Sequence, residues 1–210
     1  MIIGLDLDGT LLDSRARHVE ALRLAAAALS ISISNNIEEA YLELKRNGLN
    51  GRLALEALGV PRSGEIANIW EELIEGRNLL SLDRPYPNAL DGLREAIHKG
   101  HAFVLATCRQ DVSAALDQIS GFGLKQLLDS VHIIDPHCHS RTKASATREF
   151  RLAAIAGDTE VDHQWAIESR TRFYASAYGF RSREFWARMN VRSYDSAGDL
   201  FHSLTTGGHD

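Results

Sequence analysis

The start of the chain constrains the fold most, because an apolar segment runs directly into acidic residues. Residues 1–5 read MIIGL, and Asp6, Asp8 and Gly9 follow at once. Charge is costly to bury unless it is paired or binds a metal, so carboxylates at the end of an apolar strand indicate a site at the carboxyl edge of a parallel sheet. Gly9 allows the chain to turn sharply there. An ordinary strand-to-turn junction also uses Asp and Gly, so this segment alone leaves both interpretations open.

A second apolar segment with the same ending decides between them. Residues 153–156 read AAIA, and Gly157 and Asp158 follow, with Glu160 and Asp162 close behind. Two parallel strands of one sheet end at the same edge, so we expect both acidic groups to converge on one cation. A small set of hard oxygen ligands, completed by water and a substrate phosphate, favours magnesium over a softer metal or a closed site.

Periodicity predicts an α/β protein. After residue 83, helical and strand patterns alternate, which implies right-handed crossovers and a Rossmann-like parallel sheet flanked by helices. The strands are expected at 1–5, 102–106, 131–134, 152–156 and 173–177, and the helices at 88–98, 112–119, 143–150 and 196–204. We expect residues 1–13 and 83–210 to form this core.

Between the two parts of the core, the chain reads as helix throughout. Helical patterns cover 14–30, 37–46, 51–58 and 64–80, separated by glycine and proline. Residues 14–82 are therefore expected to form a small α-helical domain of their own. Asp13 and Thr10 are expected to serve the turn and the start of the first helix, with Ser14 as its cap.

Composition excludes several classes of protein. The 210 residues carry a formal net charge of −5 and no long basic run, which argues against binding to nucleic acid. Two cysteines do not make a disulfide framework, so a cytoplasmic location is expected. The apolar N-terminus is too short for a signal peptide or a membrane anchor. Residues 205–210 are expected to form a flexible tail.

Four segments in order resemble the motifs of haloacid dehalogenase superfamily hydrolases. DLDGT at 6–10 resembles the first motif, LAT at 105–107 the second, Lys143 the third, and GDTEVD at 157–162 the fourth. The chain is similar to the phosphatase branch, in which a helical cap follows the first motif, as in phosphoglycolate phosphatase and beta-phosphoglucomutase. On this resemblance residues 14–82 form the cap, which closes over the site and selects the substrate.

The resemblance implies a role for each motif residue. Asp6 attacks phosphorus and forms an aspartyl-phosphate, which divides one difficult displacement into two easier ones. Asp8 is the general acid and base. Mg²⁺ is held by Asp6, Asp158 and the backbone carbonyl of Asp8. The phosphoryl group is expected to contact Thr107, Lys143 and the backbone amides around Asp8, Gly9 and Cys108. Asp162 supports the metal loop from behind, and Glu160 is an alternative metal contact.

The implied function is a magnesium-dependent phosphatase acting on a small phosphorylated metabolite. Dehalogenases of the superfamily lack an acid at the position of Asp8, which favours a phosphatase or a phosphomutase. Two alternatives stay open: a sugar phosphomutase on the same core, and a binding or regulatory protein that keeps the fold without turnover. No nucleic acid or membrane partner is expected, and the oligomeric state is not determined by the sequence.

Several basic residues have competing interpretations. Lys125 is the rival of Lys143 for the third motif, and Arg141 could share its electrostatic role. Residues 44–52 are the expected specificity loop, with Arg52 or Lys45 reaching an anionic part of the substrate, or else forming a solvated turn. Arg109 either touches phosphate or lies on the surface.

One cluster of soft ligands remains. His132, His137, Cys138 and His139 lie close together in the sequence. Their spacing is not that of a closed zinc site, so exposed or core-edge histidines are favoured over metal ligands.

Overall fold

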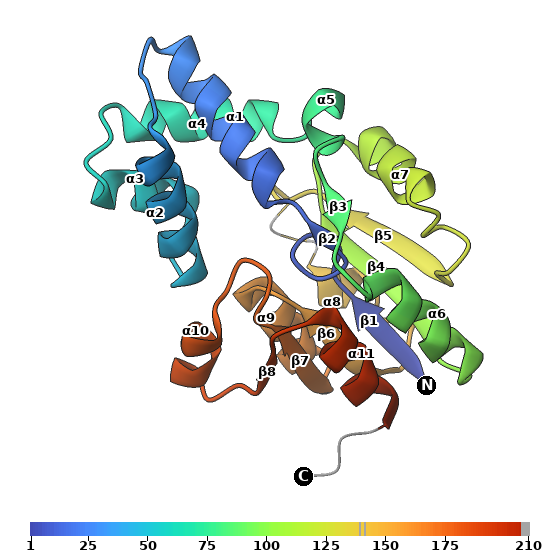
Figure 1. The fold of residues 1–210 in the computed structure, drawn as a ribbon. Helices are drawn as coiled ribbons and strands as arrows, with labels where there is room; N and C mark the ends of the chain where they lie inside the picture. Colours follow the sequence, from blue (N-terminus) through green and yellow to red (C-terminus); the bar gives the residue numbers. More distant parts are fainter. Residues whose placement is uncertain (139, 141, 207–210) are drawn as a thin grey trace.

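The protein is built around one parallel sheet (Figure 1). The computed structural model describes residues 1–138, 140 and 142–206. Six parallel strands are arranged in the order β5-β4-β1-β6-β7-β8. They are β1 (Ile2–Leu5), β4 (Ala102–Cys108), β5 (Ser130–Ile134), β6 (Leu152–Gly157), β7 (Arg172–Ser176) and β8 (Ser193–Tyr194). The α/β, Rossmann-like class predicted from the sequence is confirmed.

The register of the central strands brings the motif segments together. Leu5, the last residue of β1, pairs with Leu105 of β4 on one side and Ala156 of β6 on the other. The three strands are parallel, so the residues that follow them emerge at one edge of the sheet. Asp6, Thr107 and Asp158 all lie at this edge.

Helices cover both faces of the sheet. One face packs α6 (Ala89–His98), α7 (Val112–Gly121) and α11 (Ala197–Thr206) through residues such as Leu93, Ile119 and Phe201. The other packs α8 (Lys143–Ala146), α9 (Glu160–Glu168) and α10 (Arg183–Arg188) through Trp165 and Trp186. Neighbouring residues of a strand point to opposite faces of the sheet. The buried strands therefore present apolar side chains to the helices on both faces. None of the described helices combines the length and the apolar character needed to cross a membrane.

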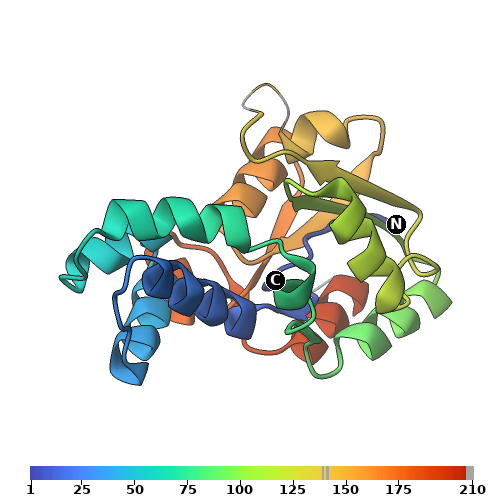
Figure 2. The same cartoon turned by 90° about the horizontal axis from the view of Figure 1, so that it is seen from above.

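The segment between the two parts of the core is helical, as expected, and we call residues 14–82 the insert. It contains α1 (Arg15–Ala28), α2 (Asn35–Arg46), α3 (Gly51–Ala57), α4 (Ser63–Leu73) and α5 (Arg77–Leu80). Its helices bury a separate apolar cluster that includes Leu22, Tyr41 and Ile66. The chain enters and leaves it through two short antiparallel strands, β2 (Leu12–Asp13) and β3 (Arg84–Pro85). Figures 1 and 2 both show the insert to one side of the core.

The expected elements differ from the structure where local capping overrides periodicity. The helix expected over 64–80 is interrupted, because Gly76 caps a new short helix. The helix expected over 143–150 ends at Ala146. Ser14 stands at the first cap without a side-chain bond, whereas Asp13 Oδ1 accepts from the backbone amide of Arg15 at 3.1 Å. Elements β2, β3, β8 and α10 are too short to show a period in the sequence. Residues 207–210 of the expected tail lie outside the described residues.

The insert is fastened to the core at the end of α2. The Arg46 guanidinium donates to the carbonyls of Gly179 and Ala177 at 2.8 and 3.0 Å, and the backbone amide of Ser182 donates to the Arg46 carbonyl at 2.9 Å. Arg181 donates in turn to the carbonyl of Lys45 at 2.7 Å. The loop of residues 177–182, which we call the docking loop, therefore holds the insert against the core.

We expect Arg46→Ala to loosen this attachment. Two hydrogen bonds from a charged donor would be lost, at a cost of about 2 kcal/mol for docking. Amide hydrogen exchange of the docking loop should accelerate, because docking protects the Ser182 amide. Arg52→Ala is the matched control: Arg52 is on the same insert but is exposed and pairs with Glu56. Equal exchange in both variants and the wild type would contradict this assignment.

Candidate active site

Three carboxylates meet at the carboxyl edge of the sheet. Asp6 follows β1, Asp158 follows β6, and Asp162 lies in the first turn of α9. All three are buried, and one oxygen from each lies within 4.8 Å of the others. Among the described residues, this is the only group of three or more candidate ligand side chains close enough to hold a metal ion.

Lys143 lies inside this cluster. It opens α8, and its Nζ donates to Asp6 Oδ1 at 2.5 Å and to Asp162 Oδ1 at 2.6 Å. The side chain is 4% exposed. Lys125, the rival from the sequence, is exposed. Only Lys143 of the two is therefore placed to act at the site; Arg141, the proposed helper, lies outside the described residues.

Asp162 orders the loop that carries Asp158. Its Oδ2 accepts from the backbone amides of Asp158 and Thr159 at 3.2 and 3.0 Å and from the Thr159 hydroxyl at 2.9 Å. These contacts include a capping box at the start of α9. With Oδ1 bonded to Lys143, both oxygens of Asp162 are occupied. This geometry fits the supporting role expected for it behind the metal ligands.

The electrostatics of the cluster fit a bound cation. Three carboxyl groups face one ammonium group, and their full ionisation would leave an excess of two negative charges in a buried space. Burial, together with the charges of neighbouring aspartates, raises the pKa of Asp6 and holds that of Asp158 well above its usual value. Although burial alone would lower the pKa of Lys143, the charges of Asp162 and Asp6 raise it. A divalent cation with hard oxygen ligands would balance this charge.

The backbone around the cluster is closely packed. Gly9 adopts a φ of +78°, and a Cβ at this position would clash with the Asp158 carboxylate. The backbone amide of Phe180, in the docking loop, donates to Asp158 Oδ2 at 2.6 Å. The loop that fastens the insert thus also positions one of the candidate metal ligands.

We expect Lys143→Met to destabilise the protein strongly. Methionine keeps much of the apolar stem, but Asp6 and Asp162 would lose their shared cation. Removing one partner from a buried ion pair costs about 3–5 kcal/mol. Chemical denaturation should show this loss, and added Mg²⁺ should recover part of it by binding the carboxylates. A variant as stable as the wild type without metal would contradict the ion-pair geometry.

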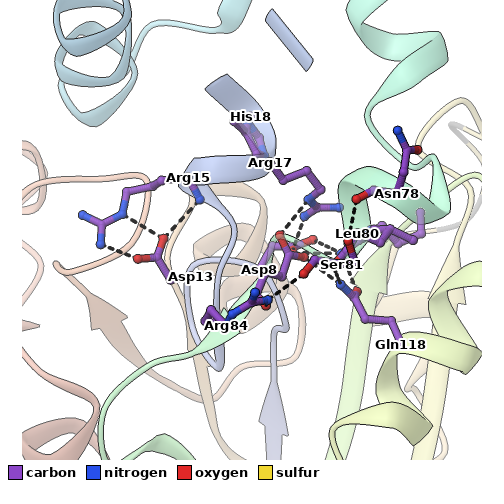
Figure 3. Close-up of polar contacts among 12 residues, drawn as sticks. Asp8, Asp13, Arg15, Arg17, His18, Asn78, Leu80, Ser81, Arg84 and Gln118 are labelled. Carbon is purple, nitrogen blue, oxygen red and sulfur yellow. Dashed lines mark hydrogen bonds and ion pairs between the residues drawn. The ribbon is translucent and has the colours of Figure 1, made fainter. Parts of the chain in front are cut away.

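Asp8 faces two buried arginines, of which Figure 3 labels Arg17. Arg17, on α1, lies 2.5 Å from Asp8 Oδ1, and Arg109, which follows β4, lies 2.7 Å from Asp8 Oδ2. Each arginine is about 2% exposed. Although burial by itself would raise the pKa of Asp8, the charges of Arg109 and Arg17 lower it. The surface position considered for Arg109 is therefore wrong, and the residue belongs to the site.

The two arginines connect Asp8 to the junction where the chain returns from the insert to the core. Arg17 Nε forms an ion pair with Asp83 Oδ1 at 3.1 Å, without hydrogen-bond geometry. Gln118 donates to Asp83 Oδ2 at 2.7 Å and accepts from Arg109 at 3.2 Å. Asp83 lies at the junction where the chain returns to the core, so the contacts of Asp8 extend to that junction.

A cavity of about 310 Å³ opens in front of these groups. The core contributes Asp6, Asp8, Cys108, Arg109 and Asp158, and the insert contributes Arg17, His18, Trp70, Glu71, Ile74 and Glu75. Thr107 is buried at the penultimate position of β4, beside this wall. The volume suits a small molecule enclosed between insert and core.

The structure separates the two candidates for a specificity residue. Arg52 is not brought to the cavity: its side chain is 65% exposed and pairs with Glu56 at 2.9 Å. Lys45 is buried at the interface between insert and core, where its Nζ lies 2.9 Å from His18 Nδ1. Glu160, the alternative metal contact, is 40% exposed and pairs with Arg181 at 2.8 Å.

The soft-ligand cluster does not assemble among its described members. His132 lies beside Ser130 and the Phe150 ring, whereas His137 lines the cavity and Cys138 lies near Ser140. His139 lies outside the described residues. The described geometry fits the favoured interpretation of separate histidines rather than a zinc site.

Sequence reasoning missed Arg17, His18 and Phe180. Arg17 carried a usable signal, because it is in phase with Ala21 and Ala25 on the buried side of α1, and a buried arginine requires a partner. Phe180 stands in an irregular loop, where no periodic pattern indicates its role.

Comparison with known proteins extends the structural argument. A scan against protein-family models and a search of curated proteins each found no match. Among solved structures, a haloacid dehalogenase-like hydrolase from Streptococcus pneumoniae matches at a TM-score of 0.73, with 20% identity over 97% of each chain. The chain has the haloacid dehalogenase fold. A protein described as a predicted phosphatase from Clostridium acetobutylicum matches at 0.74, with 16% identity and 97% of each chain covered.

Other proteins with this fold carry names that refer to different reactions. Matched structures include ones described as a putative and a predicted phosphoglycolate phosphatase and as a putative beta-phosphoglucomutase, at TM-scores of 0.67 to 0.71. The protein tyrosine kinase A of Mycobacterium tuberculosis matches at 0.74, with 18% identity over 97% of each chain. The haloacid dehalogenase fold is therefore compatible with several reactions, and the residues of the site have to decide among them.

Proposed function

We propose that the protein is a magnesium-dependent phosphatase that hydrolyses a small phosphorylated metabolite through an aspartyl-phosphate on Asp6. The observation that carries this proposal is the buried group of Asp6, Asp158, Asp162 and Lys143, which faces a cavity lined by Asp8. Proteins of like fold described as a haloacid dehalogenase-like hydrolase, a predicted phosphatase and a beta-phosphoglucomutase support it.

Two displacements account for the proposed reaction. In the first, a carboxylate oxygen of Asp6 bonds to phosphorus, the bond to the ester oxygen breaks, and Asp8 gives that oxygen a proton. In the second, Asp8 takes a proton from water, the water oxygen bonds to phosphorus, and the bond to Asp6 breaks. The arginines beside Asp8 favour its ionised form, which Asp8 reaches when it gives up its proton in the first displacement and from which it takes a proton from water in the second.

The remaining groups bind and neutralise charge. Asp6, Asp158 and the Asp8 carbonyl would hold Mg²⁺, which when bound would offset the repulsion between carboxylate and phosphate. Lys143 adds a positive charge beside Asp6, and the hydroxyl of Thr107 is proposed to donate to a phosphoryl oxygen. The insert would act as a cap that excludes water from the cavity.

Phosphate release from a panel of phosphorylated metabolites tests the proposal. Release should require Mg²⁺, cease with EDTA and return when Mg²⁺ is added in excess. The sugar phosphomutase alternative predicts an isomerised sugar phosphate without stoichiometric release of phosphate, which analysis of the products separates. Absence of both products across the panel would favour the non-catalytic alternative.

A further inference from the structure

The interface between insert and core contains a buried lysine with no carboxylate partner among its contacts in the described residues. Lys45, at the end of α2, is 8% exposed. Its Nζ lies 2.9 Å from His18 Nδ1 and 4.9 to 5.4 Å from the ring centres of Tyr41, Trp70 and Phe180. Aromatic faces stabilise an ammonium group. The rings therefore favour the ammonium form of Lys45 beside the imidazole, although burial opposes it.

This contact fixes the hydrogen-bonding form of His18. A charged lysine has donors and no acceptor, so His18 Nδ1 must accept and the ring proton must be on Nε2. The His18 ring is also held between Trp70 and Phe180, with centroid distances of 5.0 and 4.3 Å. Two rings and one ammonium group thus determine both its tautomer and its orientation.

Of the two groups, Lys45 binds the proton more readily, and below a pH of about 7 it is the charged member of the pair. Burial and the charges of Lys45, Arg17 and Arg109 hold the pKa of His18 well below its usual value. Burial and the charge of Arg181 lower the pKa of Lys45 to about 7, although Asp158 opposes this shift. The lysine therefore binds the proton more tightly than the histidine, and His18 stays neutral.

We infer that His18, held by Lys45, presents its Nε2–H to the cavity and selects phosphate esters whose leaving group carries an uncharged oxygen, such as the hydroxyl of a sugar or polyol. The inference rests on the proposed function. His18 lines the cavity, and the engagement of Nδ1 by Lys45 leaves Nε2 for a ligand. Arg17 and Arg109 also line the cavity but pair with Asp8. Glu71 and Glu75, in contrast, lie on the wall that carries His18 and disfavour a second anion there, so a neutral acceptor fits the Nε2–H donor.

Nitrogen-detected NMR of the histidine ring tests the tautomer without any assay of activity. At pH 6.5 the wild type should show a protonated Nε2 and an unprotonated Nδ1 for His18. Lys45→Met, which keeps the stem and removes the donor, should give a mixture of tautomers. A protonated Nδ1 in the wild type, or an unchanged tautomer in the variant, would overturn the assignment.

Kinetics with two kinds of ester test the selection. His18→Leu should raise the KM for a polyol or sugar phosphate about tenfold more than it raises the KM for phenyl phosphate, the effect of one lost hydrogen bond. His18→Gln, which offers an N–H near the position of Nε2, should recover most of the loss.

The outcomes separate this inference from the function on which it rests. Equal losses on both esters would mean that His18 only supports the structure and would overturn the selection. If the wild type hydrolyses neither ester nor any member of the panel, the proposed function fails and the selection fails with it. The NMR experiment still decides the tautomer in that case.

Discussion

Asp6→Asn should abolish phosphate release, with a loss on the order of 10⁴-fold or more, as for removal of a nucleophile in other covalent enzymes. The amide has nearly the shape of the carboxylate and can still accept the hydrogen bond from Lys143, which lies 2.5 Å away. It lacks the charge and the nucleophilic oxygen needed to form an acyl-phosphate. The variant is therefore expected to fold and to lose turnover.

The matched control for this prediction is Asp117→Asn. Asp117 is 60% exposed and pairs with Arg77 on the surface, so the same chemical change should leave the rate unaltered. Steady-state phosphate release with saturating Mg²⁺ measures both variants. Retention of more than a few per cent of the activity in Asp6→Asn would exclude Asp6 as the nucleophile.

Asp158→Asn should have opposite effects on the protein with and without metal. Without metal, burial beside Asp6 and Asp162 disfavours the Asp158 carboxylate, as its raised pKa shows. A neutral amide removes this repulsion and can still accept from the Phe180 amide. We expect the free energy of unfolding of the metal-free variant to exceed that of the metal-free wild type by about 1–2 kcal/mol, within the range seen when buried charge is removed.

With Mg²⁺ present, the wild type should instead be more stable than Asp158→Asn. The wild type should gain stability as Mg²⁺ rises, because an ion that binds only the folded state stabilises it. Asp158→Asn lacks one candidate ligand and should gain little, and its affinity for Mg²⁺ by calorimetry should fall about 100-fold, the upper part of the range for changes at metal sites. A variant that is less stable than the wild type without metal, or equally stabilised by Mg²⁺, would contradict the account.

The pH dependence of metal-free stability offers an internal check on Asp158→Asn. A carboxyl group whose pKa is raised on folding stabilises the folded state at low pH, and this contribution is lost as the pH rises through the folded pKa. The advantage of the amide should therefore grow with pH above the usual range of an aspartate.

The sequence predicted the core of the site because its signals are local. Asp6 and Asp158 each follow an apolar strand, and the parallel register that aligns Leu5 with Leu105 and Ala156 then brings them to one edge. Lys143 could be preferred over Lys125 because it follows a strand and opens a helix. These inferences need only strand order and chain direction, which periodicity reveals.

The contacts between insert and core could not be predicted in the same way. Arg46, Lys45 and the docking loop at 177–182 are separated by more than 130 residues in the sequence, and their contacts depend on how two packed units meet. Backbone carbonyls accept many of these bonds, and carbonyls leave no mark in the sequence. Of the two candidates for a specificity residue, Arg52 and Lys45, the sequence could not show for this reason that the Arg52 side chain on α3 is exposed and pairs with Glu56.

The central claim is a covalent phosphate on Asp6, and rapid acid quenching during turnover with a ³²P-labelled substrate tests it most directly. The account predicts transient, base-labile label on the protein that maps to the peptide containing residues 6–10 and is absent from Asp6→Asn. Turnover with no label on the protein at any time, or label on another residue, would contradict it.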